Sequence, residues 1–106
     1  MIAQIIPETK TYKSEIFSYI IPSELLNLIQ VGSIVIIPFG KKIVRGLVIE
    51  VTSHTRIQED NTKLKEIKDI YRPITFPTAY ISIIKWLAEH YFCSLGEAFA
   101  LFLPPN

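Results

Sequence analysis

The sequence is poor in residues that form covalent or metal-based cross-links. It contains a single cysteine, Cys93, which excludes an internal disulfide and suits a reducing cytoplasm. Its two histidines, His54 and His90, lie far apart in the sequence and do not have the spacing of a metal-ligand pair. No glycine-rich phosphate loop occurs among its four glycines. We therefore expect a non-catalytic binding domain that holds no cofactor of its own.

Long apolar runs are also missing. No run approaches the roughly 20 residues needed to cross a bilayer, and the chain does not start with a basic and then apolar leader. We therefore expect a cytoplasmic location and no membrane partner. Hydrophobic residues nevertheless make up 49% of the 106-residue chain. This content argues against disorder and predicts one domain, spanning 1–106, with a real core.

Charge is nearly balanced overall, with a formal net charge of +1, but it is unevenly distributed. Residues 41–72 carry eight Lys and Arg against five Asp and Glu. This is a local patch, not a polycation. It fits a modest contact with an anionic ligand better than the wrapping of a duplex.

The centre of the chain reads SIVIIPFGKK over residues 33–42. Its β-branched half predicts a buried strand over 33–37, which Pro38 should stop because proline has no N–H to donate. Gly40 allows a turn with positive φ and leaves the backbone open to a ligand. Three cations follow: Lys41, Lys42 and Arg45. The corner is either an ordinary solvated turn or a site that presents a ring, open backbone and positive charge.

Periodicity and capping signals predict the remaining elements. Strands are expected over 2–6, 16–21 and 43–53, with Gly46 marking a bulge or bend in the last. A short helical turn should follow Ser23 as its cap. Helices are expected from Thr78, as N-cap, to about residue 92, and over 95–103 behind a Ser94–Glu97 capping box. Residues 64–71 are ambiguous, but the three-residue spacing of Leu64, Ile67 and Ile70 slightly favours a helix.

The expected fold is mainly β with C-terminal helices. Several short strands with Pro and Gly corners predict a small barrel over about 1–72, and the helical tail should cover about 78–103.

Five blocks of this chain, in one order, carry a resemblance to a known family. They are FSYIIP at 17–22, GSIVIIPFGKK at 32–42, RGLV at 45–48, LKEI at 64–67 and WLAEHY at 86–91. Together they resemble the N-terminal domain of the PriA family of primosomal helicases, which restart stalled bacterial replication forks. The resemblance covers essentially the whole chain.

The resemblance implies a permuted OB-like barrel followed by two helices, with residues 64–71 as a strand, and we adopt the strand. It also implies binding to the 3′ end of single-stranded DNA, the nascent leading strand at a fork, without base specificity. ATP and zinc would belong to the rest of a longer helicase chain, of which this would be the N-terminal part. Implied partners are forked DNA, the remaining domains of the same helicase and primosome proteins.

The family's DNA-end pocket maps onto Phe17, Ser18, Tyr19, Gly40 and Lys65, and Lys41, Lys42 and Arg45 are candidate phosphate contacts. Without the resemblance, the two aromatics would fit a barrel wall and the lysines a solvated surface.

Ser18 departs from the family, which usually has aspartate at this position. A serine can accept a hydrogen bond from a 3′-hydroxyl but lacks the charge that repels a 3′-phosphate. It is either a weaker reader of the terminal hydroxyl or an inert surface residue. Two other functions stay open: a protein-interaction module that docks the helicase core or a primosome partner, and a catalytic fragment.

Overall fold

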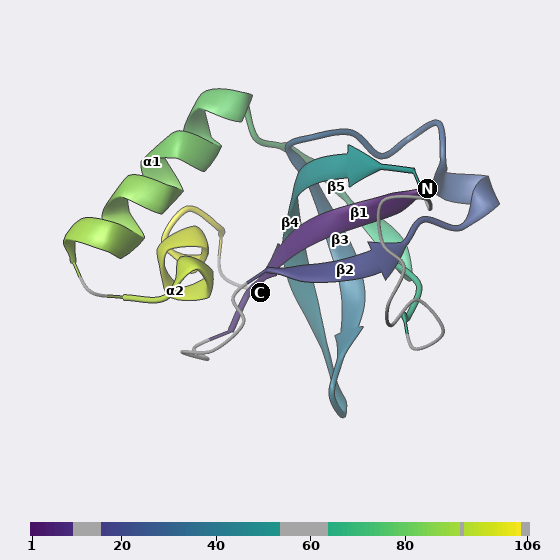
Figure 1. The fold of residues 1–106 in the computed structure, drawn as a ribbon, viewed down its shortest axis with the longest axis horizontal. Coiled ribbons are helices and arrows are strands. Elements are labelled where there is room, and N and C mark those ends of the chain that lie inside the picture. The colour runs from purple at the N-terminus through teal and green to yellow at the C-terminus, as the bar shows by residue number, and fades with distance from the viewer. Residues whose placement is uncertain (10–15, 54–63, 92, 105–106) are drawn as a thin grey trace.

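Five antiparallel strands form one sheet in the computed structural model, which describes residues 1–9, 16–53, 64–91 and 93–104. Their spatial order is β2-β1-β4-β3-β5, and two helices lie beside the sheet (Figure 1). The fold is therefore the small, mainly β, OB-like domain with C-terminal helices that the sequence predicts. The elements are β1 (Ile2–Pro7), β2 (Phe17–Ile20), a 3-10 turn η1 (Ser23–Leu25), β3 (Ser33–Phe39), β4 (Lys42–Thr52), β5 (Asp69–Thr75), α1 (Thr78–His90) and α2 (Leu95–Ala100).

The stretch before β5 brings the two ends of the sheet together. The Ile20 N–H donates to the Lys65 carbonyl at 2.9 Å, and the Ile67 N–H donates to the Ile20 carbonyl at 3.0 Å. On its other side, the Lys68 N–H donates to the Ile36 carbonyl of β3 at 2.8 Å. The extended segment thus bonds to both β2 and β3, which curls the sheet into a barrel.

These bonds correct the interpretation of residues 64–71. The helix favoured by spacing is wrong, because the backbone groups bond to distant strands instead of to the previous turn. The strand implied by the family is present but displaced: β5 begins at Asp69 and continues to Thr75. Between residues 64 and 68 the structure forms only one isolated bridge, from Glu66 to Ile20.

Side chains that alternate along the central strands point into two separate hydrophobic cores. Neighbouring residues of one strand enter different cores, as Ile5 and Ile6 do in β1 and Leu47 and Val48 do in β4. This double burial explains why the strands read as nearly continuous hydrophobic runs. The barrel interior holds Ala3, Ile5, Tyr19, Ile21, Leu25, Ile29, Val35, Ile37, Val48 and Ile67. The second core, between the sheet and the helices, holds Ile6, Ile34, Leu47, Phe76, Ile84, Ala98 and Phe99.

The β3–β4 hairpin forms around Gly40 as expected, but Pro38 does not end the strand. Pro38 pairs with Ile43 and Phe39 pairs with Lys42. Proline is tolerated here because, in the described chain, β5 pairs with β3 no further than Ile36, so the missing N–H faces a free edge.

The expected bulge at Gly46 lies elsewhere in β4. The register shifts by one residue where Gln4 pairs with Glu50 and Ile5 with Val48, which makes Ile49 the extra residue. Gly46 is required for a different reason: a Cβ there would lie 2.5 Å from the Ile5 Cγ2.

Capping was predicted correctly for one of three helical elements. The Ser94–Glu97 capping box is present, with both bonds at 3.0 Å. Pro77, not Thr78, is the N-cap of α1, and Pro22, not Ser23, is the N-cap of η1; neither makes a side-chain cap. Proline fits both positions because its fixed φ matches the N-cap φ of −58° at Pro77 and −66° at Pro22. The helices also end earlier than expected, at His90 and Ala100.

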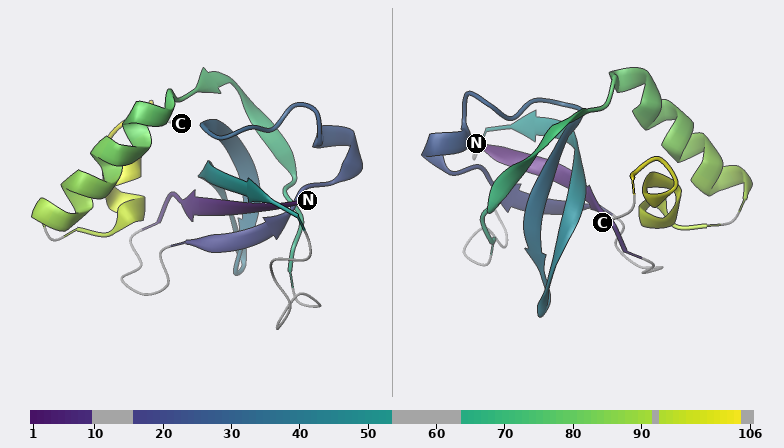
Figure 2. Two further views of the ribbon diagram at one scale, coloured as in Figure 1. Left: turned by 45° about the horizontal axis from the view of Figure 1, so that its top comes forward. Right: turned by 180° about the vertical axis from the view of Figure 1, so that it is seen from behind.

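The helical tail packs against one side of the barrel (Figure 2). Gly96 of α2 lies so close to the end of β1 that a Cβ would collide with the Pro7 and Thr9 carbonyls. None of the helices in the described part of the chain is both long and apolar enough to cross a membrane.

Candidate nucleic-acid interface

Strand β2 carries three of the residues that the family pocket suggests, and alternation divides them between two faces. Phe17 packs half-buried against the barrel core, and Tyr19 lies inside it with 5% exposure. Ser18 faces the opposite side, where its Oγ donates to the Gln4 Oε1 at 3.1 Å. Ser18 and Gln4 are direct partners across the β1–β2 ladder. The structure therefore groups Phe17 with Tyr19 but not with the Ser18 side chain.

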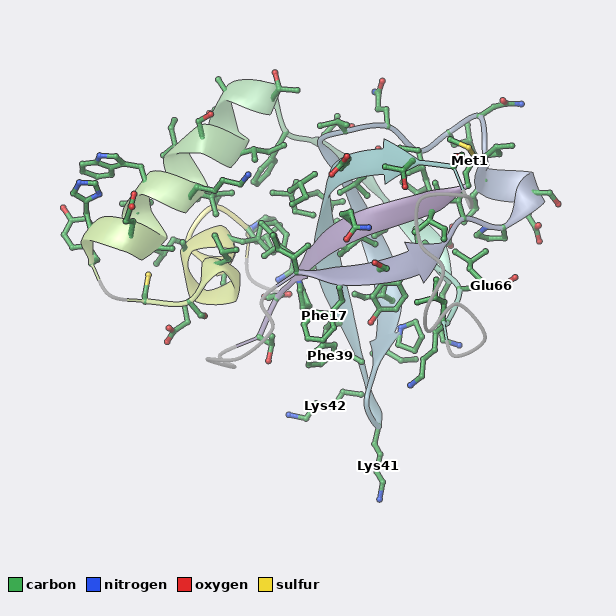
Figure 3. All side chains as sticks on the ribbon, viewed as in Figure 1. Met1, Phe17, Phe39, Lys41, Lys42 and Glu66 are labelled. Atoms are coloured by element: carbon green, nitrogen blue, oxygen red, sulfur yellow. The ribbon has the colours of Figure 1, made fainter. Side chains whose placement is uncertain are left out.

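The end of β3 meets β2 through two contacts. The Tyr19 hydroxyl donates to the Pro38 carbonyl at 2.6 Å. The rings of Phe17 and Phe39 lie 5.0 Å apart with planes at 86° (Figure 3). Burial raises the pKa of the Tyr19 hydroxyl, so it stays a neutral donor at physiological pH. These contacts hold the Pro-Phe-Gly corner against β2.

Gly40 turns the chain at the tip of this hairpin. Its φ is +61°, a conformation that favours glycine, and a Cβ built there would have no atom within 4 Å. Lys41 and Lys42 follow with exposed side chains that extend away from the barrel (Figure 3). The tip thus combines open backbone with positive charge.

Lys65 is exposed and sits beside the end of β2, because its carbonyl accepts the Ile20 N–H. The barrel closure therefore brings it near the strand that holds Phe17 and Tyr19, from far along the chain. A hollow of about 600 Å³ lies close by, lined in part by Pro38 and Glu66. Its lining contains three carboxylates, of Glu24, Glu66 and Asp69, and one lysine, Lys68. Its potential is thus unfavourable to phosphate.

Arg45, the third candidate phosphate contact at this corner, is buried with 5% exposure. Its Nε and Nη2 donate to the two Glu8 carboxylate oxygens at 2.8 and 2.9 Å. Its Nη1 donates to the Pro104 carbonyl at 3.0 Å and lies 3.4 Å from the Tyr71 hydroxyl. The hydrogen bond to Glu8, and to a lesser extent that to Tyr71, raises the pKa of Arg45 further. Its charge is committed inside the protein, which leaves Lys41 and Lys42 as the exposed cations of the hairpin.

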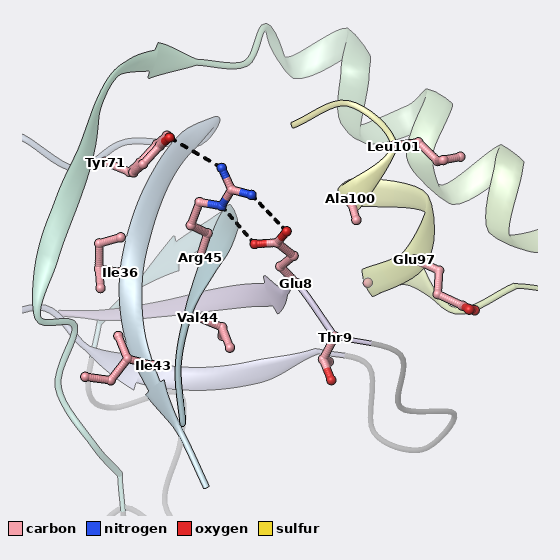
Figure 4. Close-up of a pocket in the computed structure, with 11 residues that line it drawn as sticks. Glu8, Thr9, Ile36, Ile43, Val44, Arg45, Tyr71, Glu97, Ala100 and Leu101 are labelled. Atoms are coloured by element: carbon pink, nitrogen blue, oxygen red, sulfur yellow. Dashed lines mark hydrogen bonds and ion pairs between the residues drawn. The ribbon is translucent and has the colours of Figure 1, made fainter. Parts of the chain in front are cut away.

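This arginine lies in a second, larger pocket of about 670 Å³ between the barrel and α2 (Figure 4). Sequence reasoning missed this pocket, and also the partners Glu8 and Gln4. Glu8 is 37 residues from Arg45 in the sequence, and only the β1–β4 register brings them together. The pocket walls are mainly apolar and include Ile36, Ile43, Val44, Ala100 and Leu101.

His90 and Cys93 each contact neighbouring groups of the helical tail. His54 lies outside the described residues. His90 stacks on Trp86 with ring centroids 4.3 Å apart, and the Cys93 sulfur faces the Leu87 carbonyl at 3.9 Å. Across the ranges that the structure describes, no three His, Cys, Asp or Glu side chains cluster as a metal site would need.

Comparison with known proteins assigns the family. The profile of the 3′DNA-binding domain (3′BD) of PriA matches residues 5–104. The chain belongs to this family. A curated relative, replication restart protein PriA of Chlamydia trachomatis serovar D, is 37% identical over 97 residues, which cover 86% of this chain and 12% of the relative.

Two further relatives carry the same name. PriA of Chlamydia muridarum is 30% identical over 95 residues, covering 86% of this chain and 12% of its own. PriA of Synechocystis sp. is 31% identical over 91 residues, which cover 86% of this chain and 11% of the relative. The chain thus spans about 12% of the length of the relatives it matches. The match to the 3′BD family begins within β1 and extends past the end of α2.

Proposed function

We propose that this 3′BD domain binds the 3′ end of single-stranded DNA, without base specificity, as the DNA-recognition part of a longer replication-restart protein. The observation that carries the proposal is the corner formed by the Phe17 and Phe39 rings, next to Gly40 and the exposed lysines. Family membership supports the same ligand.

The chemistry of a strand end fits these side chains. A terminal nucleotide offers a flat base, a free sugar hydroxyl and one phosphate on its inner side. Aromatic rings contact any base, for about 1–3 kcal/mol per base. Open backbone at Gly40 permits close approach, and Lys65, Lys41 and Lys42 supply positive charge for the phosphate. Recognition of an end then depends on shape and not on base sequence.

Ser18 is the proposed reader of the terminal hydroxyl. Over Phe17–Tyr19, β2 is an edge strand in the described chain. A nucleotide lying across this edge would contact the half-buried Phe17 ring on one face and the Ser18 hydroxyl on the other. Ser18 gives its proton to Gln4, which leaves its lone pairs to accept from a 3′-hydroxyl. Because it is neutral, it should repel a 3′-phosphate less than the aspartate that the family usually has.

The test is a fluorescence anisotropy titration with a short single-stranded oligonucleotide labelled at its 5′ end. Three 3′ ends are compared: a hydroxyl, a phosphate and a bulky cap. We expect the hydroxyl to bind best, the phosphate slightly less well and the bulky cap poorly. Equal binding of all three would refute end recognition and leave a general single-strand binder.

Two variants sharpen this test. Ser18→Asp should increase the discrimination against the 3′-phosphate, and an unchanged hydroxyl-to-phosphate ratio would remove Ser18 from the site. Lys65→Ala should weaken all binding and reduce its salt dependence. Lys85→Ala, which removes an exposed lysine of α1, is the matched control and should change neither.

A second candidate function is docking of another protein on α1. Ile83 and Trp86 of α1 are 43% and 50% exposed, and Tyr91, which directly follows the helix, is 66% exposed. Trp86 stacks on His90 and lies edge-to-face with Tyr91 at 6.1 Å, which makes a preformed aromatic surface. A Trp86→Ala change should leave DNA binding intact. If it abolished DNA binding in a folded protein, the separation of the two functions would be wrong.

A further inference from the structure

Phe39 is not one of the residues of the family's DNA-end pocket, but it lies directly beside them. It directly precedes Gly40, and its ring is half-buried. Within the described residues, its one ring-to-ring contact is with Phe17, the first residue of the pocket set. The two rings come from strands β2 and β3, which are not neighbours in the sheet. The barrel curvature alone brings them together, so the contact belongs to the tertiary fold.

The geometry of the pair forms a corner. Planes at 86° with centroids 5.0 Å apart place one ring nearly perpendicular to the other. A base lying flat on one ring would meet the second ring with its edge. Stacked and edge-to-face contacts are both favourable for aromatic groups, and neither requires a particular base. The corner therefore limits where a base can lie without selecting its identity.

Tyr19 fixes this corner from inside the barrel. Its hydroxyl proton is donated to the Pro38 carbonyl at 2.6 Å, and Pro38 immediately precedes Phe39. The bond ties the backbone of β3 to the side chain of β2 at the point where the two rings meet. Tyr19 is 5% exposed, so little of its ring can contact a ligand directly.

We infer that Phe39 is a base-contacting residue of the DNA-end site, and that Tyr19 acts as a positioning residue that holds Phe39 against Phe17. This inference rests on the proposed function. It divides the three aromatics between two roles: Phe17 and Phe39 contact the terminal base, and the Tyr19 hydroxyl holds the two rings in position.

The experiment measures anisotropy with two 5′-labelled oligonucleotides that differ at the 3′-terminal residue, which is either a normal nucleotide or an abasic one. Phe39→Ala should weaken binding of the normal oligonucleotide roughly 5- to 10-fold and of the abasic one by less than about twofold. Ile43→Ala is the control, because Ile43 is an exposed apolar residue of the same hairpin that lines the other pocket. It should change neither affinity.

The possible outcomes distinguish a failure of the inference about Phe39 from a failure of the proposed function. If Phe17→Ala weakens binding and Phe39→Ala does not, the inference fails and the proposed function stands. An equal loss with both oligonucleotides also overturns the role of Phe39. If the wild type ignores the state of the 3′ end and Phe17→Ala has no effect, the proposed function itself fails. Phe39→Leu keeps apolar bulk in case the alanine variant does not fold, and its loss should again be confined to the normal oligonucleotide.

The positioning role of Tyr19 needs a readout that stability alone would not give. Tyr19→Phe removes the bond to Pro38 but keeps the ring. It should weaken binding about threefold in the wild type and have no further effect in Phe39→Ala, because the two residues act through one contact. Equal losses in both backgrounds would refute the coupling.

Discussion

Replacing Arg45 by methionine should destabilise the domain strongly without changing how it binds DNA. Arg45 donates two short bonds to Glu8 and one to the Pro104 carbonyl, and it is almost fully buried. Breaking a buried pair costs roughly 3–5 kcal/mol. Because the Glu8 side chain is 25% exposed and can regain water, the lower end applies, about 3 kcal/mol. For a domain of this size the midpoint of thermal unfolding should fall by roughly 10–20 °C.

The assay is urea unfolding followed by circular dichroism. Lys42→Met is the control, an exposed residue of the same strand, and should change stability by less than about 0.5 kcal/mol. Adding Glu8→Gln to Arg45→Met should recover part of the loss, since it removes the unpaired carboxylate. If Arg45→Met lowered the free energy of unfolding by less than about 0.5 kcal/mol, the bonds of Arg45 to Glu8 and Pro104 would not stabilise the domain as argued. DNA affinity and its salt dependence, measured while the variant is folded, should match the wild type, and a reduced slope would show that Arg45 contacts phosphate.

Three further predictions concern the turn, the barrel interior and the hairpin tip. Gly32→Ala should destabilise by about 3 kcal/mol or more in urea unfolding, because φ is +99° there and a Cβ would collide with the Phe76 carbonyl; a stable variant would refute the close approach. Burial raises the pKa of Tyr19, so its stabilising contribution is complete below about pH 10, its unfolded-state pKa, and is lost as pH rises further; thermal unfolding from pH 8 to 11 should decline less steeply in Tyr19→Phe than in the wild type, and parallel curves would count against this. Lys41→Ala with Lys42→Ala should lower the slope of log K against log salt by roughly 1.4 if each lysine meets a phosphate, and an unchanged slope would place both outside the interface.

Local signals explain what could be predicted from the sequence. Strand β3, the turn at Gly40 and the capping box at Ser94 depend on residues that are neighbours in the chain. β-Branched runs, a glycine at positive φ and a serine three residues before a glutamate each specify backbone geometry through short-range sterics or hydrogen bonds.

Long-range partners explain what could not be predicted. Residues 64–68 have helical spacing, yet their backbone bonds to Ile20 and Ile36, which no local pattern reveals. Arg45 counts as a free cation in any tally of charge, but the fold pairs it with Glu8.

In the candidate site, one feature could have been predicted from the local sequence pattern, and two depend on long-range contacts. Alternation along β2 could have predicted that Ser18 faces away from Phe17 and Tyr19. Its partner Gln4 depends on the β1–β2 register, and the Phe17–Phe39 contact depends on barrel curvature, so neither follows from pattern alone. Family resemblance supplied the site positions, and the structure supplies their neighbours.

The two cores share the same central strands, so we expect the domain to unfold as a single cooperative unit. Ile6, Ile34 and Leu47 project from the barrel strands into the core that the helices cover. A chain shortened to end at Thr75 would leave these side chains in water and would aggregate or unfold instead of forming a smaller barrel. Amide hydrogens of α2 and of β4 should then exchange through the same global opening, so the tail is an integral wall of the domain and not an appendage to it.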